Sequence, residues 1–253
     1  MNIYSIVDHT NLEKIIIMFN SVYLNSSSKN LNFYILTDKE QTEFIKIPEY
    51  LNLKIKNVEF DNNWEPTLHS FNRNFYKGSS WCKHDMNFGR FLFFKYFPYV
   101  ERVIYLDWDM LVIGDIYNLK EYYDLIDQMI VSETQINLFY SNIFTKTFQV
   151  PTNLTFEGLR RNLSLCRKLH MIFQYMNMDL EKIFQTKGFN SGFYIVSREH
   201  FEENYVLGLI RKIILIQKKF NCFNFGTQVI MNLMNINNRL FVSRSWNNFA
   251  NNI

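Results

Sequence analysis

The chain has 253 residues, of which 47% are hydrophobic and 20% charged, and these proportions exclude a long disordered protein. Its 27 basic and 24 acidic residues give a net charge of +3. This balance argues against nucleic acid as a partner, because nucleic-acid binding requires clustered basic side chains. No linker-like tract or internal repeat divides the sequence, so we expect one domain spanning residues 1–253.

Cysteine usage and the N-terminal residues bear on where the protein works. Cys82, Cys166 and Cys222 are widely spaced, which argues against a disulfide framework or a structural zinc site. The first residues lack the basic segment and apolar run of a signal peptide, and no apolar stretch is long enough to span a bilayer. We therefore expect a cytoplasmic protein without a transmembrane segment, and the sequence leaves its oligomeric state open.

The first sixty residues alternate short apolar runs with helical patterns. The apolar runs predict strands over Ile3–Val7, Asn32–Leu36 and Leu53–Val58. A spacing of about 3.6 residues between apolar positions predicts a helix over Leu12–Leu24, and Asp38–Glu40 has the composition of a second helix start. This order is typical of a parallel sheet with crossover helices.

The rest of the chain continues this alternation. Further strands are predicted at Val103–Leu106, Gln128–Ser132, Phe193–Val196 and Leu240–Val242, with Met110–Ile113 as another apolar run. Helices are predicted over Phe88–Phe97, Phe156–Tyr175, Tyr205–Phe220 and Gln228–Leu233. The polar and aromatic residues 61–87 predict a surface excursion, and residues 137–185 predict an inserted helical subregion. The expected fold class is α/β, with a mixed, mainly parallel sheet flanked by helices.

The sharpest motif is VIYLDWDMLVIGDI, in which an apolar strand is followed by Asp107 and Asp109. In an extended backbone, residues i and i+2 point to the same side. Two such carboxylates repel each other unless a cation lies between them, and hard oxygen ligands suit Mn²⁺ or Mg²⁺. That ion could hold a diphosphate and neutralise the charge on it as it leaves. The alternative is an acidic pair that ends a strand on a solvated surface.

Four segments of the chain together resemble glycosyltransferase family 8, the retaining nucleotide-sugar transferases that include glycogenin and bacterial lipooligosaccharide galactosyltransferases. They are Ile3–Ser26 with Phe33–Asp38, Asn87–Ile116, Gly188–Ser197, and Gly226–Met234 with Trp246-Asn247. The resemblance implies a Rossmann-like GT-A fold and the transfer of a hexose or N-acetylhexosamine from a UDP-sugar with Mn²⁺. The acceptor would be a hydroxyl of a glycan, protein or lipid.

The resemblance also implies roles for particular residues. Asp107 and Asp109 match the metal-binding pair, and Asp109 and Gln228 are the catalytic candidates, with Gln228 near the anomeric carbon. The residues implied in binding the nucleotide sugar are Asp8, Thr10, Arg90, Asp107, Trp108, Asn190, Ser191, Gly192 and Gln228.

Each of these candidates also has a plainer structural interpretation. Asp8 could be the N-cap of the next helix, and Arg90 an ordinary surface arginine. Trp108 could be a core aromatic residue, Asn190–Gly192 a simple turn, and Gln228 a polar residue at a helix start.

The chain departs from the family pattern at several places. Thr10 and Asn11 replace a common Asn-Tyr pair, and Thr227 replaces an aspartate, which makes Thr227 a candidate for donor choice. No counterpart of the family's metal-binding histidine, or of its closing Gly/Lys/Pro/Trp stretch, lies between Asn247 and Ile253. A truncation, a water molecule or another chain could account for this. The histidines present, none of which has the matching context, are His9, His69, His84, His170 and His200.

Two other functions fit parts of the sequence. A catalytically weak or inactive member of the family would bind a nucleotide sugar or glycan without turnover. A nucleotidyltransferase also uses carboxylates at a strand end with a divalent metal, but Asn190-Ser191-Gly192 in its family position argues against it. Residues 137–185 lie where acceptor contacts could be made, so they could set acceptor specificity.

Overall fold

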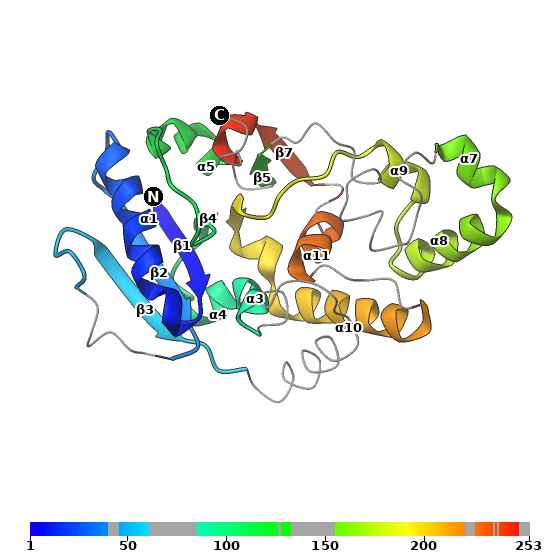
Figure 1. The fold of residues 1–253 in the computed structure, drawn as a ribbon, viewed down its shortest axis with the longest axis horizontal. Helices are drawn as coiled ribbons and strands as arrows, with labels where there is room; N and C mark the ends of the chain where they lie inside the picture. The colour runs from blue at the N-terminus through cyan, green and yellow to red at the C-terminus, as the bar shows by residue number, and fades with distance from the viewer. Residues whose placement is uncertain are drawn as a thin grey trace.

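The computed structural model describes residues 1–39, 46–60, 85–125, 128–132, 155–220, 226–234, 236 and 238–247. Its centre is a seven-stranded sheet in the order β3-β2-β1-β4-β6-β5-β7 (Figure 1). The strands are β1 (Asn2–Val7), β2 (Asn32–Thr37), β3 (Asn52–Asn57), β4 (Arg102–Leu106), β5 (Met129–Ser132), β6 (Phe193–Ser197) and β7 (Arg239–Val242). The apolar runs predicted each of these strands to within about one residue at either end.

The described helices surround this sheet. They are α1 (Leu12–Asn25), α3 (Met86–Gly89), α4 (Phe93–Tyr96), α5 (Lys120–Tyr123), α7 (Phe156–Arg161), α8 (Leu163–Tyr175), α9 (Leu180–Gln185), α10 (Glu203–Phe220) and α11 (Gly226–Met234). Short 3₁₀ turns are η1 (His9–Asn11), η4 (Arg90–Leu92), η5 (Ile116–Leu119), η7 (Arg198–Phe201) and η8 (Arg244–Asn247). Among the described helices, none combines the length and the apolar character needed to cross a membrane.

The sheet is mixed but mainly parallel, as predicted. β1 pairs in parallel with β2 and with β4, and β2 pairs in parallel with β3. β6 runs antiparallel between β4 and β5, and β7 pairs in parallel with β5. The carboxyl end of β4 therefore lies beside the start of β6, which brings Asp107 next to the Asn190–Gly192 segment.

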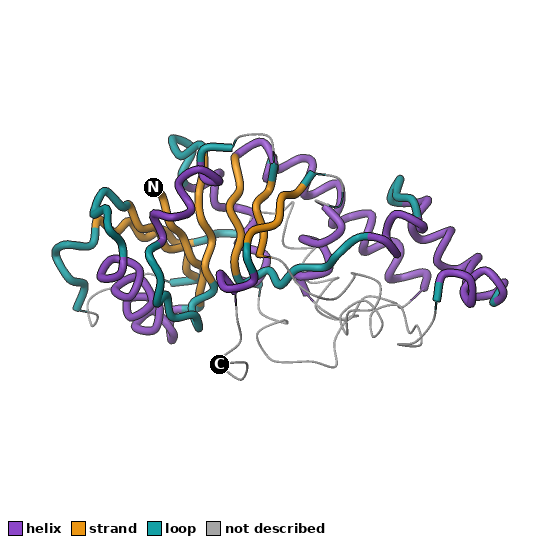
Figure 2. Tube along the Cα trace, turned by 90° about the horizontal axis from the view of Figure 1, so that it is seen from above, coloured by secondary structure: helices purple, strands orange, loops and turns teal. Residues whose placement is uncertain are grey.

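Both faces of the sheet are buried at its central strands, which explains their continuous apolar runs, whereas the residues of the edge strand β3 alternate between exposed and half-buried. On β1, Ile3 and Val7 join the core cluster that includes the apolar side of α1. Tyr4 and Ile6 point to the opposite face and join the cluster built from α3, α4, α10, α11 and the helices α7–α9. In both views α7, α8 and α9 lie at the end of the molecule opposite β3 (Figures 1 and 2).

Two of the predicted helices are interrupted. The helix predicted over Phe88–Phe97 is a succession of α3, η4 and α4, and the carbonyl of Arg90 in η4 accepts a hydrogen bond from the buried Tyr4 hydroxyl at 2.8 Å. The helix predicted over Phe156–Tyr175 is divided at Asn162, whose backbone is not helical (φ −90°, ψ 82°). Asn162 Oδ1 instead accepts from the Leu165 N–H at 3.2 Å and caps α8, a role that asparagine favours.

Other predictions on these segments have mixed outcomes. The helical insert is confirmed for residues 155–185, which form α7, α8 and α9. The helix start predicted at Asp38–Glu40 is described only as far as Lys39, where the chain bends, and most of the excursion at 61–87 and the first part of the insert lie outside the described residues. Met110–Ile113 is not a strand, because Val112 forms its hydrogen bonds with α1: its N–H donates to Ser21 Oγ, and its carbonyl accepts from the Asn25 side chain, both at 2.9 Å.

Candidate active site

Asp107 and Asp109 lie in a turn that directly follows β4. The strand ends at Leu106, and the Met110 N–H donates to the Asp107 carbonyl at 3.2 Å, which closes the turn. The prediction that the two carboxylates share a side as in an extended strand is therefore wrong in its backbone geometry. Burial raises the pKa of Asp107; the charge of Arg90 and the Tyr105 hydroxyl oppose this rise, and the nearby Asp109 charge adds to it to a smaller extent. Asp109 is exposed, whereas the Asp107 side chain is only 29% exposed.

The Asn190-Ser191-Gly192 turn packs against Asp107. The Asp107 N–H donates to the Gly192 carbonyl at 2.8 Å, and the Gly192 N–H donates to Asn190 Oδ1 at 3.0 Å. A Cβ at residue 192 would lie 3.1 Å from Asp107 Oδ2, 3.4 Å from Asn190 Oδ1 and 3.6 Å from Asn247 Oδ1. Three side-chain oxygens therefore converge on the space that glycine leaves open.

The space beside Gly192, lined by Asp107 and Asn190, is called the corner below. Asn247 reaches this corner from the far end of the described chain. It ends η8, and its Nδ2 donates to the Asn190 carbonyl at 3.1 Å. This bond fixes the backbone of the Asn190-Ser191-Gly192 turn and leaves Asn247 Oδ1 on the side of Gly192. Apart from the position of Asn247 in the fourth similar segment, no sequence pattern indicated this contact.

Arg90 lies behind Asp107 and is almost completely buried, with 4% of its side chain exposed. Its Nη2 is 3.6 Å from Asp107 Oδ1, and its Nη1 donates to Ser191 Oγ at 3.2 Å and to the Ser191 carbonyl at 3.3 Å. Its Nε donates to the Asn87 carbonyl at 3.1 Å. Burial alone would lower the pKa of Arg90, but Tyr105 and Asp107 raise it by more than burial lowers it. The guanidinium is therefore a permanent cation.

Two buried polar residues, Asn87 and Thr227, support Arg90 from the interior. Asn87 Oδ1 accepts from Arg90 Nη2 at 3.2 Å and from the Thr227 hydroxyl at 2.6 Å. Asn87 and Thr227 are 4% and 2% exposed, so Thr227 acts on the corner through Asn87 and Arg90. Neither Asn87 nor this chain of contacts was expected from the sequence.

Gln228 lies beside the same turn. Its Nε2 donates to the Phe189 carbonyl at 3.4 Å, directly before Asn190. Asn232, one turn further along α11, accepts from the Phe189 N–H and donates to the Phe189 carbonyl, both at 2.9 Å. The first turns of α11 therefore fix the backbone that leads into Asn190, and Asn232 is a residue that sequence reasoning missed.

Asp8 follows β1 and serves as the N-cap of η1. Its carboxylate accepts from the Thr10 N–H at 3.0 Å, from the Thr10 hydroxyl, and from Asn11 Nδ2 at 2.9 Å. The alternative interpretation of Asp8 as an N-cap is therefore confirmed. Thr10 is exposed at this end of the sheet.

Trp108 connects the turn after β4 to the start of α1. The ammonium of Lys14 lies 4.7 Å from the centre of the Trp108 ring, within the range of a cation–π interaction. Lys14 also donates to Asn11 Oδ1 at 2.6 Å. Trp108 is partly exposed and packs against the apolar cluster around α1, so it joins the Asp8 end of β1 to the Asp107 end of β4.

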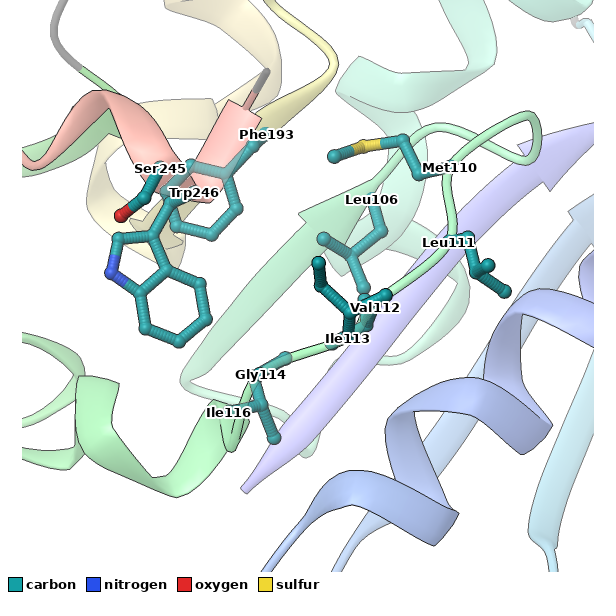
Figure 3. A pocket seen from close by; sticks show the side chains of 10 residues that line it. All are labelled: Leu106, Met110, Leu111, Val112, Ile113, Gly114, Ile116, Phe193, Ser245 and Trp246. Atoms are coloured by element: carbon teal, nitrogen blue, oxygen red, sulfur yellow. The ribbon is translucent and has the colours of Figure 1, made fainter. Parts of the chain in front are cut away.

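An apolar cavity of about 220 Å³ opens next to the turn. Trp246 and Phe193 lie on one side of it, with rings 6.3 Å apart, and Met110 and Val112 lie on the other (Figure 3). Ser245 lines the same cavity. This cavity has the wrong chemistry for a diphosphate, so the polar corner at Gly192 is the candidate active site.

The donor set at the corner fits a hard divalent cation. Asp107, Asn190 and Asn247 direct carboxylate and amide oxygens to this corner, and the exposed Asp109 follows two residues after Asp107. Mg²⁺ and Mn²⁺ accept such oxygens together with water. Among the described residues, no group of three or more His, Cys, Asp or Glu side chains is placed to hold a metal ion.

Three solved structures share this fold at low sequence identity. The galactosyltransferase LgtC, solved with donor and acceptor sugar analogues, is 13% identical with a TM-score of 0.54, over 96% of this chain and 73% of that one. Mouse xyloside xylosyltransferase 1 is 13% identical with a TM-score of 0.59, over 96% and 85%. GlyE of Streptococcus pneumoniae TIGR4 is 14% identical with a TM-score of 0.51, over 97% and 46%. No curated protein sequence matches significantly.

The mixed sheet flanked by helices and these neighbours define a GT-A fold. The family model for glycosyl transferase family 8 matches residues 2–252, and the chain belongs to this family. The resemblance stated from the sequence is confirmed. Family and fold together support a glycosyltransferase.

Proposed function

We propose that this chain transfers a hexose or N-acetylhexosamine from a UDP-sugar to an acceptor hydroxyl, with retention at the anomeric carbon and with Mn²⁺ or Mg²⁺. The observation that carries the proposal is the corner where Asp107, Asn190 and Asn247 direct oxygens towards the space beside Gly192, with Arg90 buried behind them. Oxygen ligands for a cation and amide groups for sugar hydroxyls are what a metal-bound nucleotide sugar requires.

In this proposal Asp107 and Asp109 hold the metal. When bound, the metal neutralises the negative charge that develops on the leaving diphosphate. The Asn190 amide binds sugar hydroxyls, and the missing side chain of Gly192 lets the sugar approach the backbone. Trp108 lies at the ribose, and Asp8 and Thr10 lie towards the uracil ring.

Arg90 and Ser191 would serve the donor indirectly. All three guanidinium nitrogens of Arg90 contact protein acceptors: Nε and Nη2 contact Asn87, Nη1 contacts Ser191, and Nη2 also lies near Asp107. The charge of Arg90 therefore acts on the donor through Asp107 and Ser191. A fixed cation behind a carboxylate offsets part of the repulsion between Asp107 and Asp109.

The proposed reaction exchanges one bond at the anomeric carbon for another. The acceptor oxygen bonds to that carbon as the bond to the diphosphate oxygen breaks, on the same face of the sugar. The acceptor proton passes to the departing diphosphate. Gln228, next to the turn, stabilises the positive charge that develops on the sugar. Residues 137–185 would contact the acceptor.

The direct test is UDP release from UDP-glucose, UDP-galactose and UDP-N-acetylglucosamine with Mn²⁺. We expect one donor to be consumed, and Asp109→Ala to abolish turnover with little change in thermal stability, because Asp109 is exposed. Glu121→Ala, an exposed acid on α5, is the matched control and should retain full activity.

The other outcomes separate the alternatives. Binding of UDP without turnover would indicate the non-catalytic family member. Consumption of a nucleoside triphosphate with release of pyrophosphate would indicate a nucleotidyltransferase. Failure to bind UDP or to consume any of the three donors would reject the proposal.

A further inference from the structure

The two oxygens of the Asp107 carboxylate have different surroundings. Oδ1 accepts a hydrogen bond from the Tyr105 hydroxyl at 2.5 Å and lies 3.6 Å from Arg90 Nη2. Oδ2 faces the space beside Gly192, where a Cβ would lie 3.1 Å from it. One oxygen is therefore held by the protein interior, and the other is directed towards the candidate site.

Tyr105 is placed to hold that carboxylate by the geometry of β4. Tyr105 is the last residue but one of β4, two residues before Asp107, and its hydroxyl reaches the Asp107 carboxylate. Its ring is fully buried and stacks on Tyr194 at 4.6 Å with an angle of 11°, and the Arg90 guanidinium lies 4.9 Å from its centre. Both contacts restrict movement of the ring.

The neighbouring tyrosine hydroxyls are engaged elsewhere. The hydroxyls of Tyr4 and Tyr194 lie 2.7 Å apart, and the Tyr4 hydroxyl donates to the Arg90 carbonyl at 2.8 Å. A buried tyrosine hydroxyl requires a partner, and the partner of Tyr105 is Asp107. The tyrosines and Arg90 together form a rigid support beneath one carboxylate.

We propose that Tyr105 is a positioning residue, whose hydroxyl fixes the Asp107 carboxylate so that Oδ2 alone is presented to the metal and the donor diphosphate. The proposal deepens the proposed function and depends on it. A bond to a charged acceptor is stronger than one between neutral groups, and it restricts rotation of the carboxylate. Without the hydroxyl, Arg90 would be the principal partner of the carboxylate, which could then turn towards the interior.

The test compares Tyr105→Phe with Tyr34→Phe. The first change keeps the stacked ring and removes only the hydroxyl. Tyr34, 3% exposed on β2, is the matched control, because its hydroxyl contacts Asn2 Oδ1 at 3.4 Å and takes no part in the site. Mn²⁺ affinity in the presence of UDP is measured by electron paramagnetic resonance, with donor KM and kcat determined separately and unfolding midpoints as the check on folding.

We expect Tyr105→Phe to weaken Mn²⁺ binding by about tenfold, as loss of groups that orient metal ligands commonly does. Tyr34→Phe should bind Mn²⁺ as the wild type does. A folded Tyr105→Phe variant with wild-type Mn²⁺ affinity would refute the positioning role while leaving the proposed function intact. A wild-type chain that binds neither Mn²⁺ nor UDP would refute the proposed function, and the positioning role with it.

Discussion

Replacing Gly192 by alanine tests the geometry of the corner without changing any charge. The new Cβ would lie 3.1 Å from Asp107 Oδ2, about 0.3 Å inside the 3.4 Å at which ordinary contact begins. The carboxylate cannot easily yield, because Tyr105 holds its other oxygen. Overpacking of this kind costs about 1–3 kcal/mol, and each kcal/mol lowers the unfolding midpoint of a chain of this size by about 2–4 °C.

The control is Gly208→Ala in α10, where a Cβ would meet nothing within 4 Å. Alanine in a helix interior should raise stability there by about 0.5–1 kcal/mol. We expect calorimetry to give opposite shifts for the two variants, and UDP binding with Mn²⁺ to fall about tenfold for Gly192→Ala alone. A Gly192→Ala protein with wild-type stability and wild-type UDP affinity would refute the claim that the Asp107 carboxylate packs closely against residue 192.

Three further changes test other parts of the structure. Gly89→Ala should lower the free energy of unfolding by about 1–3 kcal/mol in urea titrations, because its Cβ would overlap the Ile6 side chain; an unchanged value would contradict the close approach of α3 to β1. Arg90→Met should cost up to about 3 kcal/mol and abolish turnover, since it leaves buried acceptors and a carboxylate without their cation; an active, stable variant would refute this. Although burial raises the pKa of Asp38, the hydrogen bonds from His9 lower it overall, so Asp38 contributes stability above its unfolded value of 3.8 that is lost as the pH falls through its folded value. Asp38→Asn should therefore be less stable than wild type at about pH 7, and the difference should shrink as the pH falls below 3.8 and through the lower folded value; a difference that is independent of pH would contradict this.

The central strands could be predicted from the sequence because they are short apolar runs buried on both faces, and the edge strand β3 because its residues alternate between exposed and half-buried positions. The interrupted helices could not, since their breaks depend on particular contacts. Asn162 ends one helix and caps the next, and the carbonyl of Arg90 accepts a hydrogen bond from Tyr4 on β1. The spacing of apolar residues alone does not predict such contacts.

The site was predictable only in part. The turn at Asp107 and Asp109 and the Asn190-Ser191-Gly192 segment were identified from the sequence, and the sheet places them side by side. The support beneath them was not, because Tyr4 and Tyr194 read as ordinary strand aromatics. Their hydroxyls acquire a role only when β1, β4 and β6 are adjacent, which is a property of the topology.

The most direct test of the central claim is a crystal structure of the chain with Mn²⁺ and UDP, with the metal located by its anomalous scattering. We expect the ion at the turn after β4, bound by Asp107 Oδ2 and Asp109, with the diphosphate completing its coordination and the uridine towards Asp8. A crystal in which UDP and Mn²⁺ bind elsewhere, or in which this corner stays free of both at saturating concentrations, would contradict the account.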